Sequence, residues 1–279
     1  MIPVLLHIGP LTVYSYGLMM ALGFLAADFV ISLECKRRAF PNDYSSSIVV
    51  WAAIVGIAGS RLLDVINNFP VYMADPKSII FSGSGFVWYG GMLGGILGVY
   101  LVARYYRLPW LATADMCAPA LAIGQAIGRL GCQLSGDGDW GLPSTLPWAM
   151  SYPRAIVGWN SATVLKLDEH WRLVSGYFPG VRVHPAPVYE TLLYLGVFAI
   201  LWSVRARVHP NGRLLYLYFM LAGAARFVVE FVRINPRVFL MFSEAQIIAV
   251  GMILFGAAAW YLSGARGQSE VAPKEALRA

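Results

Sequence analysis

The stretch from Gly128 to Gly141, Gly-Arg-Leu-Gly-Cys-Gln-Leu-Ser-Gly-Asp-Gly-Asp-Trp-Gly, combines residue types that can bind an anion. It holds one arginine, two aspartates and five glycines at the end of a long apolar segment. Glycine lets backbone amides approach a ligand closely, and an arginine fork binds phosphate in a fixed geometry. This position predicts a binding site for a lipid headgroup at a membrane surface.

A second set of charges lies on one predicted helix. Arg226, Glu230 and Arg233 are spaced at i, i+4 and i+7, which places them on the same helix face. A cationic face with one carboxylate suits a phosphate site that needs a positioned partner. The alternative is an internal salt bridge that holds the helices together and has no further role.

Three arginines lie inside apolar segments: Arg61, Arg129 and Arg226. A charge within a bilayer is costly unless it is paired or hydrated, so each is a candidate functional residue. Counting about 1.5 Å per residue along each helix places all three, together with Glu230, in the outer half of the membrane.

Two tyrosines, Tyr16 and Tyr89, lie near the outer ends of the first and third predicted spans. With the charged residues they bring polar groups from five spans to one depth, which predicts an outward-facing polar cavity.

Simpler explanations exist for some of these polar residues. Both tyrosines could belong to an aromatic belt at the interface. Arg61 could pair with Asp64 one turn away, and Arg129 could extend its side chain to the interface.

The composition shows which kind of fold must position these residues. Of 279 residues, 58% are hydrophobic and 13% are charged, against about 25% charged in soluble domains. Seven stretches can cross a hydrocarbon core of about 30 Å: 11–33, 48–66, 86–104, 111–133, 186–204, 214–232 and 245–263. We therefore predict an all-α polytopic membrane protein with seven transmembrane helices. Its catalytic domain, residues 1–265, includes a small extracytoplasmic cap at 134–185, and a cytoplasmic tail follows at 266–279.

Glycines are concentrated in the third predicted span. Gly90, Gly91, Gly94, Gly95 and Gly98 form overlapping pairs four residues apart. Small residues at this spacing let two helices approach closely, so we expect these glycines to support the site through helix packing.

The basic residues predict the orientation. One side of the membrane carries eleven lysines and arginines and the other seven, four of which lie in the long cap. Because cytoplasmic loops are enriched in basic residues, the amino terminus is expected outside and the carboxyl terminus in the cytoplasm. The net charge of +6 then reflects contact with anionic lipid rather than nucleic acid. The three cysteines have no metal-ligand spacing, so we expect neither a metal nor a disulfide framework.

The order of several short motifs is more specific than any one of them. They are Tyr16-Gly-Leu-Met, Gly-Ser-Arg61, Asn68-Phe-Pro with Met73-Ala-Asp-Pro76, Tyr89-Gly-Gly-Met-Leu-Gly-Gly, Gly128-Arg-Leu-Gly, His184-Pro with Tyr189-Glu190, and Arg226-Phe-Val-Val-Glu230-Phe-Val-Arg233. Over nearly its whole length the chain resembles the bacterial phosphatidylglycerol–prolipoprotein diacylglyceryl transferase family. The resemblance implies seven helices with an extracytoplasmic head, in agreement with the predicted topology.

The resemblance also implies a reaction. A diacylglyceryl group moves from phosphatidylglycerol to the lipobox cysteine thiol of a prolipoprotein signal peptide, and glycerol phosphate leaves. Such an enzyme works in the bacterial cytoplasmic (inner) membrane, in contact with membrane lipid. It needs no cofactor, because arginines can supply the positive charge. The catalytic candidates are then Arg226, Arg129, Tyr89 and Glu230. The substrate-binding candidates are Arg129, Tyr16, Arg61, Asp137, Gly141 and Arg233.

The chain departs from the family pattern at a few positions. Tyr89 stands where many members have a histidine, and an unperturbed tyrosine titrates near pH 10, so it is a poor general base. Cys132 replaces an asparagine, Asp137 replaces a glutamate, and one extra residue precedes Gly141. These departures favour a second hypothesis, a divergent paralogue with the same lipid donor and another acceptor. A lipid or anion transporter is a third, but the chain shows no duplicated halves.

Overall fold

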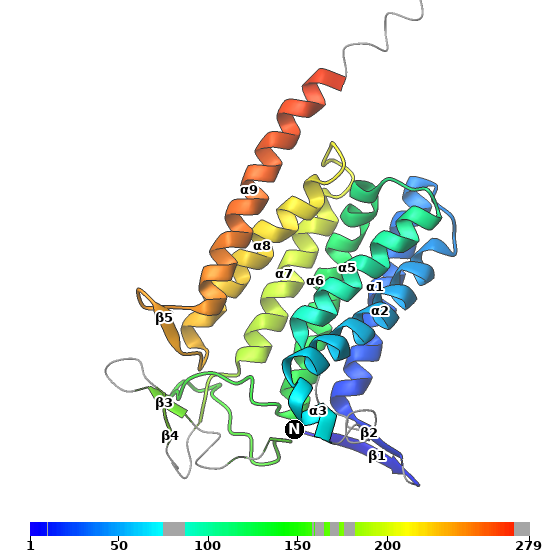
Figure 1. Cartoon of the computed structure of the whole chain (residues 1–279). Coiled ribbons are helices and arrows are strands. Elements are labelled where there is room, and N and C mark those ends of the chain that lie inside the picture. Colours follow the sequence, from blue (N-terminus) through cyan, green and yellow to red (C-terminus); the bar gives the residue numbers. More distant parts are fainter. Residues whose placement is uncertain are drawn as a thin grey trace, which may run out of the picture. The chain divides into compact units, whose positions relative to one another are not determined.

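We describe a computed structural model of the chain (Figure 1). It describes residues 1–9, 11–74, 87–157, 159, 165–167, 173–175 and 182–270. A long helix lies at each of the seven predicted spans. These are α1 (Ser15–Arg38), α2 (Tyr44–Asn67), α5 (Trp88–Tyr105), α6 (Trp110–Ser135), α7 (Ala186–Val204), α8 (Arg213–Val229) and α9 (Glu244–Glu270).

Six helices of the described residues are long and apolar enough to cross a membrane. The helix outside this set is α5, which is 18 residues long. It contains repeated glycines, aromatic residues at both ends and Arg104, and it is not among the six helices that meet this criterion. Helices satisfy their own backbone hydrogen bonds, as a chain crossing lipid must. The chain is thus a mainly helical, polytopic membrane protein.

Short elements precede the first long helix and lie in the connections between the others. They are β1 (Val4–Ile8), β2 (Leu11–Tyr14), α3 (Phe69–Ala74), β3 (Leu165–Leu167), β4 (Leu173–Ser175), the 3-10 helix η1 (Glu230–Val232), β5 (Arg237–Phe239) and β6 (Phe242–Ser243). The strands form three antiparallel pairs, β1 with β2, β3 with β4 and β5 with β6.

The predicted start of the first span at residue 11 is wrong. Residues 11–14 form strand β2, in which Val13 pairs with Leu6 and Thr12 with His7, and the helix begins at Ser15. An apolar run continues from the strand into the helix, and the run alone does not mark where one becomes the other. The β-branched Thr12 and Val13 favour the strand.

The chain divides into two compact units, which we describe separately. Unit 1 comprises residues 1–27 and 117–279, and unit 2 comprises residues 28–116. In unit 2, the glycine face of α5 lies directly on the backbone of α2. A Cβ on Gly98 would lie 2.6 Å from the carbonyl oxygen of Trp51, and one on Gly90 would lie 2.8 Å from the Cβ of Leu63. The predicted role of these glycines in close helix packing is confirmed.

In unit 1, an apolar layer joins α6, α7 and α8. Ala118, Ala122 and Ala126 repeat every four residues along one face of α6. They pack with buried side chains of the two other helices, among them Tyr194, Val197, Leu201, Leu214, Tyr218, Ala222 and Ala225. Alanines on one face let the helices approach closely. The charged residues follow at the edge of this layer, since Arg129 lies one turn beyond Ala126 and Arg226 is next to Ala225.

Candidate functional site

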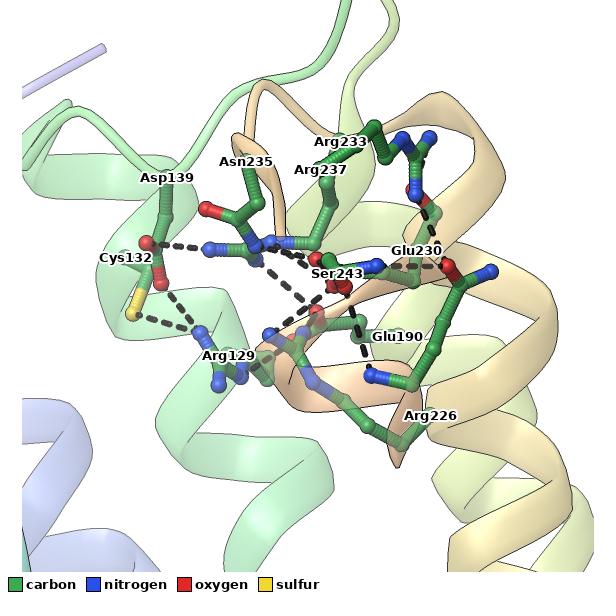
Figure 2. Close-up of polar contacts among 11 residues, drawn as sticks. Arg129, Cys132, Asp139, Glu190, Arg226, Glu230, Arg233, Asn235, Arg237 and Ser243 are labelled. Atoms are coloured by element: carbon green, nitrogen blue, oxygen red, sulfur yellow. Dashed lines mark hydrogen bonds and ion pairs between the residues drawn. The ribbon is translucent and has the colours of Figure 1, made fainter. Parts of the chain in front are cut away.

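Three arginines converge on one carboxylate at the end of the apolar layer (Figure 2). Glu190, near the start of α7, is 1% exposed. Its Oε1 accepts hydrogen bonds from Nη1 of Arg226 at 2.8 Å and from Nη1 of Arg233 at 2.9 Å. Its Oε2 forms an ion pair with Nε of Arg129. We call Arg129, Arg226 and Arg233 the arginine cluster.

A second buried carboxylate, Glu230, holds Arg226 from the other side. Nη2 of Arg226 lies 3.0 Å from its Oε2. Its Oε1 accepts hydrogen bonds from Ser243 Oγ at 2.8 Å and from Asn235 Nδ2. The Arg226–Glu230 pair expected from the helical spacing is present. Arg233, however, lies beyond the end of the helix, since η1 ends at Val232 and Arg233 has an extended backbone.

The β5–β6 hairpin and the start of α9 close the network behind Glu230. Gln246, which is fully buried, accepts hydrogen bonds through Oε1 from Arg237 Nη1 at 2.8 Å and from the Ser243 amide at 3.1 Å. The backbone amide of Gln246 donates to Ser243 Oγ. Nη2 of Arg237 also donates to the carbonyl oxygen of Glu230. The position of Glu230 is therefore fixed by polar groups from three segments of the chain.

The third carboxylate on the cluster belongs to Asp139. Nη2 of Arg233 lies 2.6 Å from its Oδ1, and Nη1 of Arg129 contacts its Oδ2. Burial alone would raise the pKa of Asp139, but the charges of Arg233 and Arg129 outweigh it and hold this pKa below its usual range. Asp137, the aspartate expected in the site, instead accepts a hydrogen bond from the Asp139 amide at 3.3 Å.

Gly141 connects this loop to the segment that carries Arg233. Its amide donates to the carbonyl oxygen of His184 at 2.8 Å, and it forms an isolated β-bridge with Arg233. A Cβ at position 141 would lie 2.8 Å from the Cβ of His184 and closer still to the carbonyl oxygen of Val232. Glycine is needed here because two backbones approach more closely than a side chain allows.

Tyr16 lies at the same end of unit 1. Its ring packs over Gly131 of α6, where an added Cβ would lie 3.3 Å from the tyrosine Cδ2. It is 42% exposed and within electrostatic range of Arg129 and Cys132. Of the residues expected to converge, Tyr16, Arg129, Arg226 and Glu230 thus lie together, and Glu190 of α7 joins them.

Arg61 and Tyr89 belong to unit 2, and their membership of this site stays a prediction. Tyr89 is half-exposed at the start of α5, and its ring packs edge-to-face with Trp88 at 5.2 Å between centroids. Arg61 is half-buried on α2. Asp64, the partner considered for Arg61, accepts hydrogen bonds from Asn68 Nδ2 at 3.0 Å and from the Tyr72 hydroxyl.

One group of side chains in the described residues has the donor atoms of a metal site. Cys132, Asp137 and Asp139 place a sulfur and two carboxylate oxygens within 4.8 Å of one another. Both oxygens of Asp139 already contact arginines, and Nη1 of Arg129 lies 3.9 Å from the Cys132 sulfur. A cation here would lie beside a guanidinium charge, so we assign these residues to the arginine network.

Two of the three arginines are more exposed than the carboxylates that hold them from the helices. The side chains of Arg129 and Arg226 are 29% and 24% exposed, whereas those of Glu190 and Glu230 are 1% and 0% exposed. Buried carboxylates fix the guanidinium groups, while parts of the Arg129 and Arg226 side chains stay accessible beside the more exposed Asp139. Such an arrangement binds an anion in a preorganised geometry.

Comparison with known proteins places the chain in a family. Residues 3–262 match the family model described as prolipoprotein diacylglyceryl transferase. A phosphatidylglycerol–prolipoprotein diacylglyceryl transferase of Clostridium tetani is 31% identical over 91% of this chain and 94% of its own length. Proteins of that name from Dehalococcoides mccartyi and Bordetella parapertussis are 33% and 32% identical, over 92% and 96% of this chain and 90% and 97% of their own lengths. The chain belongs to the prolipoprotein diacylglyceryl transferase family.

Proposed function

We propose that this protein transfers the diacylglyceryl group of phosphatidylglycerol to a cysteine thiol of a prolipoprotein. The observation that carries the proposal is the arginine cluster, held by buried Glu190 and Glu230 at the end of membrane-spanning helices in a member of this family. A lipid phosphate can reach such a cluster from the bilayer. The acceptor is the signal peptide of the prolipoprotein, and membrane lipid surrounds both substrates.

The proposed chemistry matches the charges of the site. The cysteine sulfur forms a bond to the glyceryl carbon that carries the phosphate, and the bond from that carbon to the phosphate oxygen breaks. The products are a thioether and glycerol phosphate, and the thiol proton passes to the medium or to the phosphate. Negative charge on the phosphate grows as the bond breaks. Guanidinium groups that bind this charge more tightly in the transition state therefore lower the barrier.

We assign roles to the residues on this basis. Arg129 and Arg226 bind the phosphate and stabilise the leaving group, and Arg233 is a further phosphate-binding residue of the cluster. Glu190 and Glu230 are positioning residues that orient the arginines. Tyr16 lies beside the cluster as a substrate-binding residue.

Further assignments rest on the sequence. Asp137 and Gly141 shape the loop below the headgroup, and Gly141 positions Arg233. Arg61 is a further phosphate-binding residue. Tyr89 donates a hydrogen bond to the phosphate through its hydroxyl group.

The proposed topology extends the six spans to seven by including α5. The amino terminus lies outside the cytoplasmic membrane and the carboxyl terminus in the cytoplasm, so the cap at 134–185 is extracytoplasmic. Residues 1–265 form the catalytic domain and 266–279 the tail. This orientation places the arginine cluster on the outer side, where secreted prolipoproteins arrive.

The test is release of glycerol phosphate by the purified protein in detergent, with phosphatidylglycerol and a peptide containing a lipobox cysteine. We expect release that depends on the peptide and stops when its cysteine is changed to serine. The Arg226→Ala variant should remain folded and lose this activity. Near-normal turnover of that variant would remove Arg226 from the mechanism.

A second candidate function is transfer from the same lipid to a different acceptor. Tyr89 and Cys132, which depart from the family pattern, favour it. Cys132 is 8% exposed and lies against Arg129, so a departure here touches the phosphate-binding residue itself. Binding of phosphatidylglycerol without peptide-dependent release would support this candidate, and peptide-dependent release would exclude it.

A further inference from the structure

Asp139 contacts the arginine cluster in the way that a phosphate would. One of its oxygens accepts from Arg233 and the other from Arg129, so a single anionic group bridges two guanidinium groups. Carboxylate and phosphate are the two anions that arginine binds through paired N–H donors. The space between Arg129 and Arg233 is therefore filled by an internal anion.

Among the three carboxylates on the cluster, Asp139 is the one that can leave. Its side chain is 33% exposed, whereas Glu190 and Glu230 are almost completely buried. Separating a buried carboxylate from its arginine leaves an uncompensated charge in a low dielectric, which is strongly unfavourable. An exposed carboxylate can be rehydrated instead. The departure of Asp139 therefore has the smallest electrostatic penalty.

The loop that carries Asp139 has the backbone for such a movement. Gly136 and Gly138 adopt positive φ angles of 65° and 98°. The loop is anchored at both ends, by the Gly136 amide on Cys132 and by the Gly141 amide on His184. Between these anchors Asp139 donates through its amide to the side chain of Asp137, a bond that both aspartates can exchange for water.

We propose that Asp139 occupies the phosphate position between Arg129 and Arg233, and that the headgroup phosphate of the lipid binds by displacing it. The proposal rests on the proposed function, because it identifies the incoming anion as the phosphate of that substrate. Asp139 is then a positioning and specificity-determining residue. A ligand without an anionic group cannot displace it, and it competes with bound glycerol phosphate after the reaction, which speeds product release.

Glycerol phosphate binding to the purified full-length protein in detergent tests the displacement. Titration calorimetry at fixed pH and ionic strength would compare the wild type with Asp139→Asn, which keeps the shape but loses the charge. We expect the variant to bind glycerol phosphate about tenfold more tightly or better, since a competing charge-assisted contact is gone. Unchanged or weaker binding by a variant with wild-type elution and melting temperature would overturn the proposal.

Two further variants distinguish displacement of Asp139 from a general effect of removing negative charge. Asp139→Glu restores a carboxylate of similar reach and should return the affinity toward the wild-type value. Glu244→Gln removes an exposed carboxylate at the start of α9, outside the residues assigned to binding, and should change the affinity by less than about threefold. Equal strengthening by Glu244→Gln and Asp139→Asn would show that charge alone is responsible, and would refute displacement.

Turnover distinguishes failure of this inference from failure of the proposed function. With phosphatidylglycerol and the lipobox peptide, Asp139→Asn should be inhibited by glycerol phosphate at about tenfold lower concentration than the wild type. Peptide-dependent release by the wild type, without tighter product binding in Asp139→Asn, would retain the transferase and overturn displacement. No release by the wild type would contradict the transferase, and the calorimetric comparison would still decide whether Asp139 competes for the anion site.

Discussion

Replacing Glu190 by glutamine should reduce turnover about a hundredfold while leaving the protein folded. Glu190 is 1% exposed and contacts all three members of the arginine cluster, two through Oε1 and Arg129 through Oε2. Glutamine has nearly the same shape, but it replaces one oxygen by an NH₂ group. The NH₂ group is a hydrogen-bond donor, and it would face the N–H donors of an arginine without offering an acceptor.

The magnitude follows from what glutamine can and cannot replace. The amide oxygen can still accept from Arg226 and Arg233 at the present distances of 2.8 Å and 2.9 Å, although without a full charge. The contact to Arg129 is lost. A hydrogen bond to a charged group contributes about 1.5–3 kcal/mol, and breaking a buried pair costs about 3–5 kcal/mol. Arg129 and Arg226 are about a quarter exposed and can be rehydrated in part, whereas Arg233 is 9% exposed. We therefore take about 3 kcal/mol, which is roughly two powers of ten in rate.

The assay is the initial rate of glycerol phosphate release at saturating phosphatidylglycerol and peptide. Glu244→Gln is the matched control, because Glu244 is an exposed carboxylate at the start of α9 and undergoes the same chemical change. We expect the control to stay within about twofold of the wild type. A folded Glu190→Gln protein with more than about a tenth of wild-type turnover would refute the idea that Glu190 holds the arginines in place.

Other features of the structure allow three more predictions. Gly141→Ala should lower turnover more than about tenfold. The added Cβ would meet the carbonyl oxygen of Val232 and shift the neighbouring Arg233 of the arginine cluster. Gly90→Ala should lower the free energy of unfolding by about 1–3 kcal/mol, as measured by thermal denaturation. Gly251→Ala, where an added Cβ meets nothing within 4 Å, should not. Burial raises the pKa of Tyr152 to about 12, so the stability it contributes is present below about pH 10 and is lost as pH rises through the folded value. The test is a titration of tyrosinate formation in the wild type minus that in Tyr152→Phe. A midpoint near pH 10 in this difference would contradict the raised pKa.

The spans could be predicted because bilayer thickness and hydropathy fix them almost independently of the rest of the chain. Helix ends were less predictable. The apolar run from residue 11 begins with the second strand of a hairpin, and the first helix begins only at Ser15. Hydropathy does not separate this strand from the helix. Arg233 was expected on a helix face, yet it reaches the same cluster from an extended segment. The helical spacing is therefore not the reason that Arg233 lies beside Glu190.

The site was predicted less completely than the spans. Arginines within apolar spans are visible in any sequence, since few residues there carry charge. Glu190 is also charged and lies just inside a span, but its contact with three arginines depends on packing between α6, α7 and α8. Asp139 could not be distinguished from Asp137, because two glycines let the loop direct either carboxylate inward. Gln246 and Ser243 gave no signal beyond a polar residue at the start of a span.

The balance of charge in the cluster explains why its carboxylates differ so much in exposure. Arginines at the edge of a membrane need counter-charges, since unpaired guanidinium groups there would be unstable. A cluster neutralised completely by buried carboxylates would have little affinity left for phosphate. Glu190 and Glu230 supply fixed counter-charge from behind, and Asp139 supplies the remainder from an exposed loop. A displaceable carboxylate keeps the arginines paired when the site is empty and yields the same donors to the substrate. The stability of the empty site and its affinity for an anion then depend on different residues.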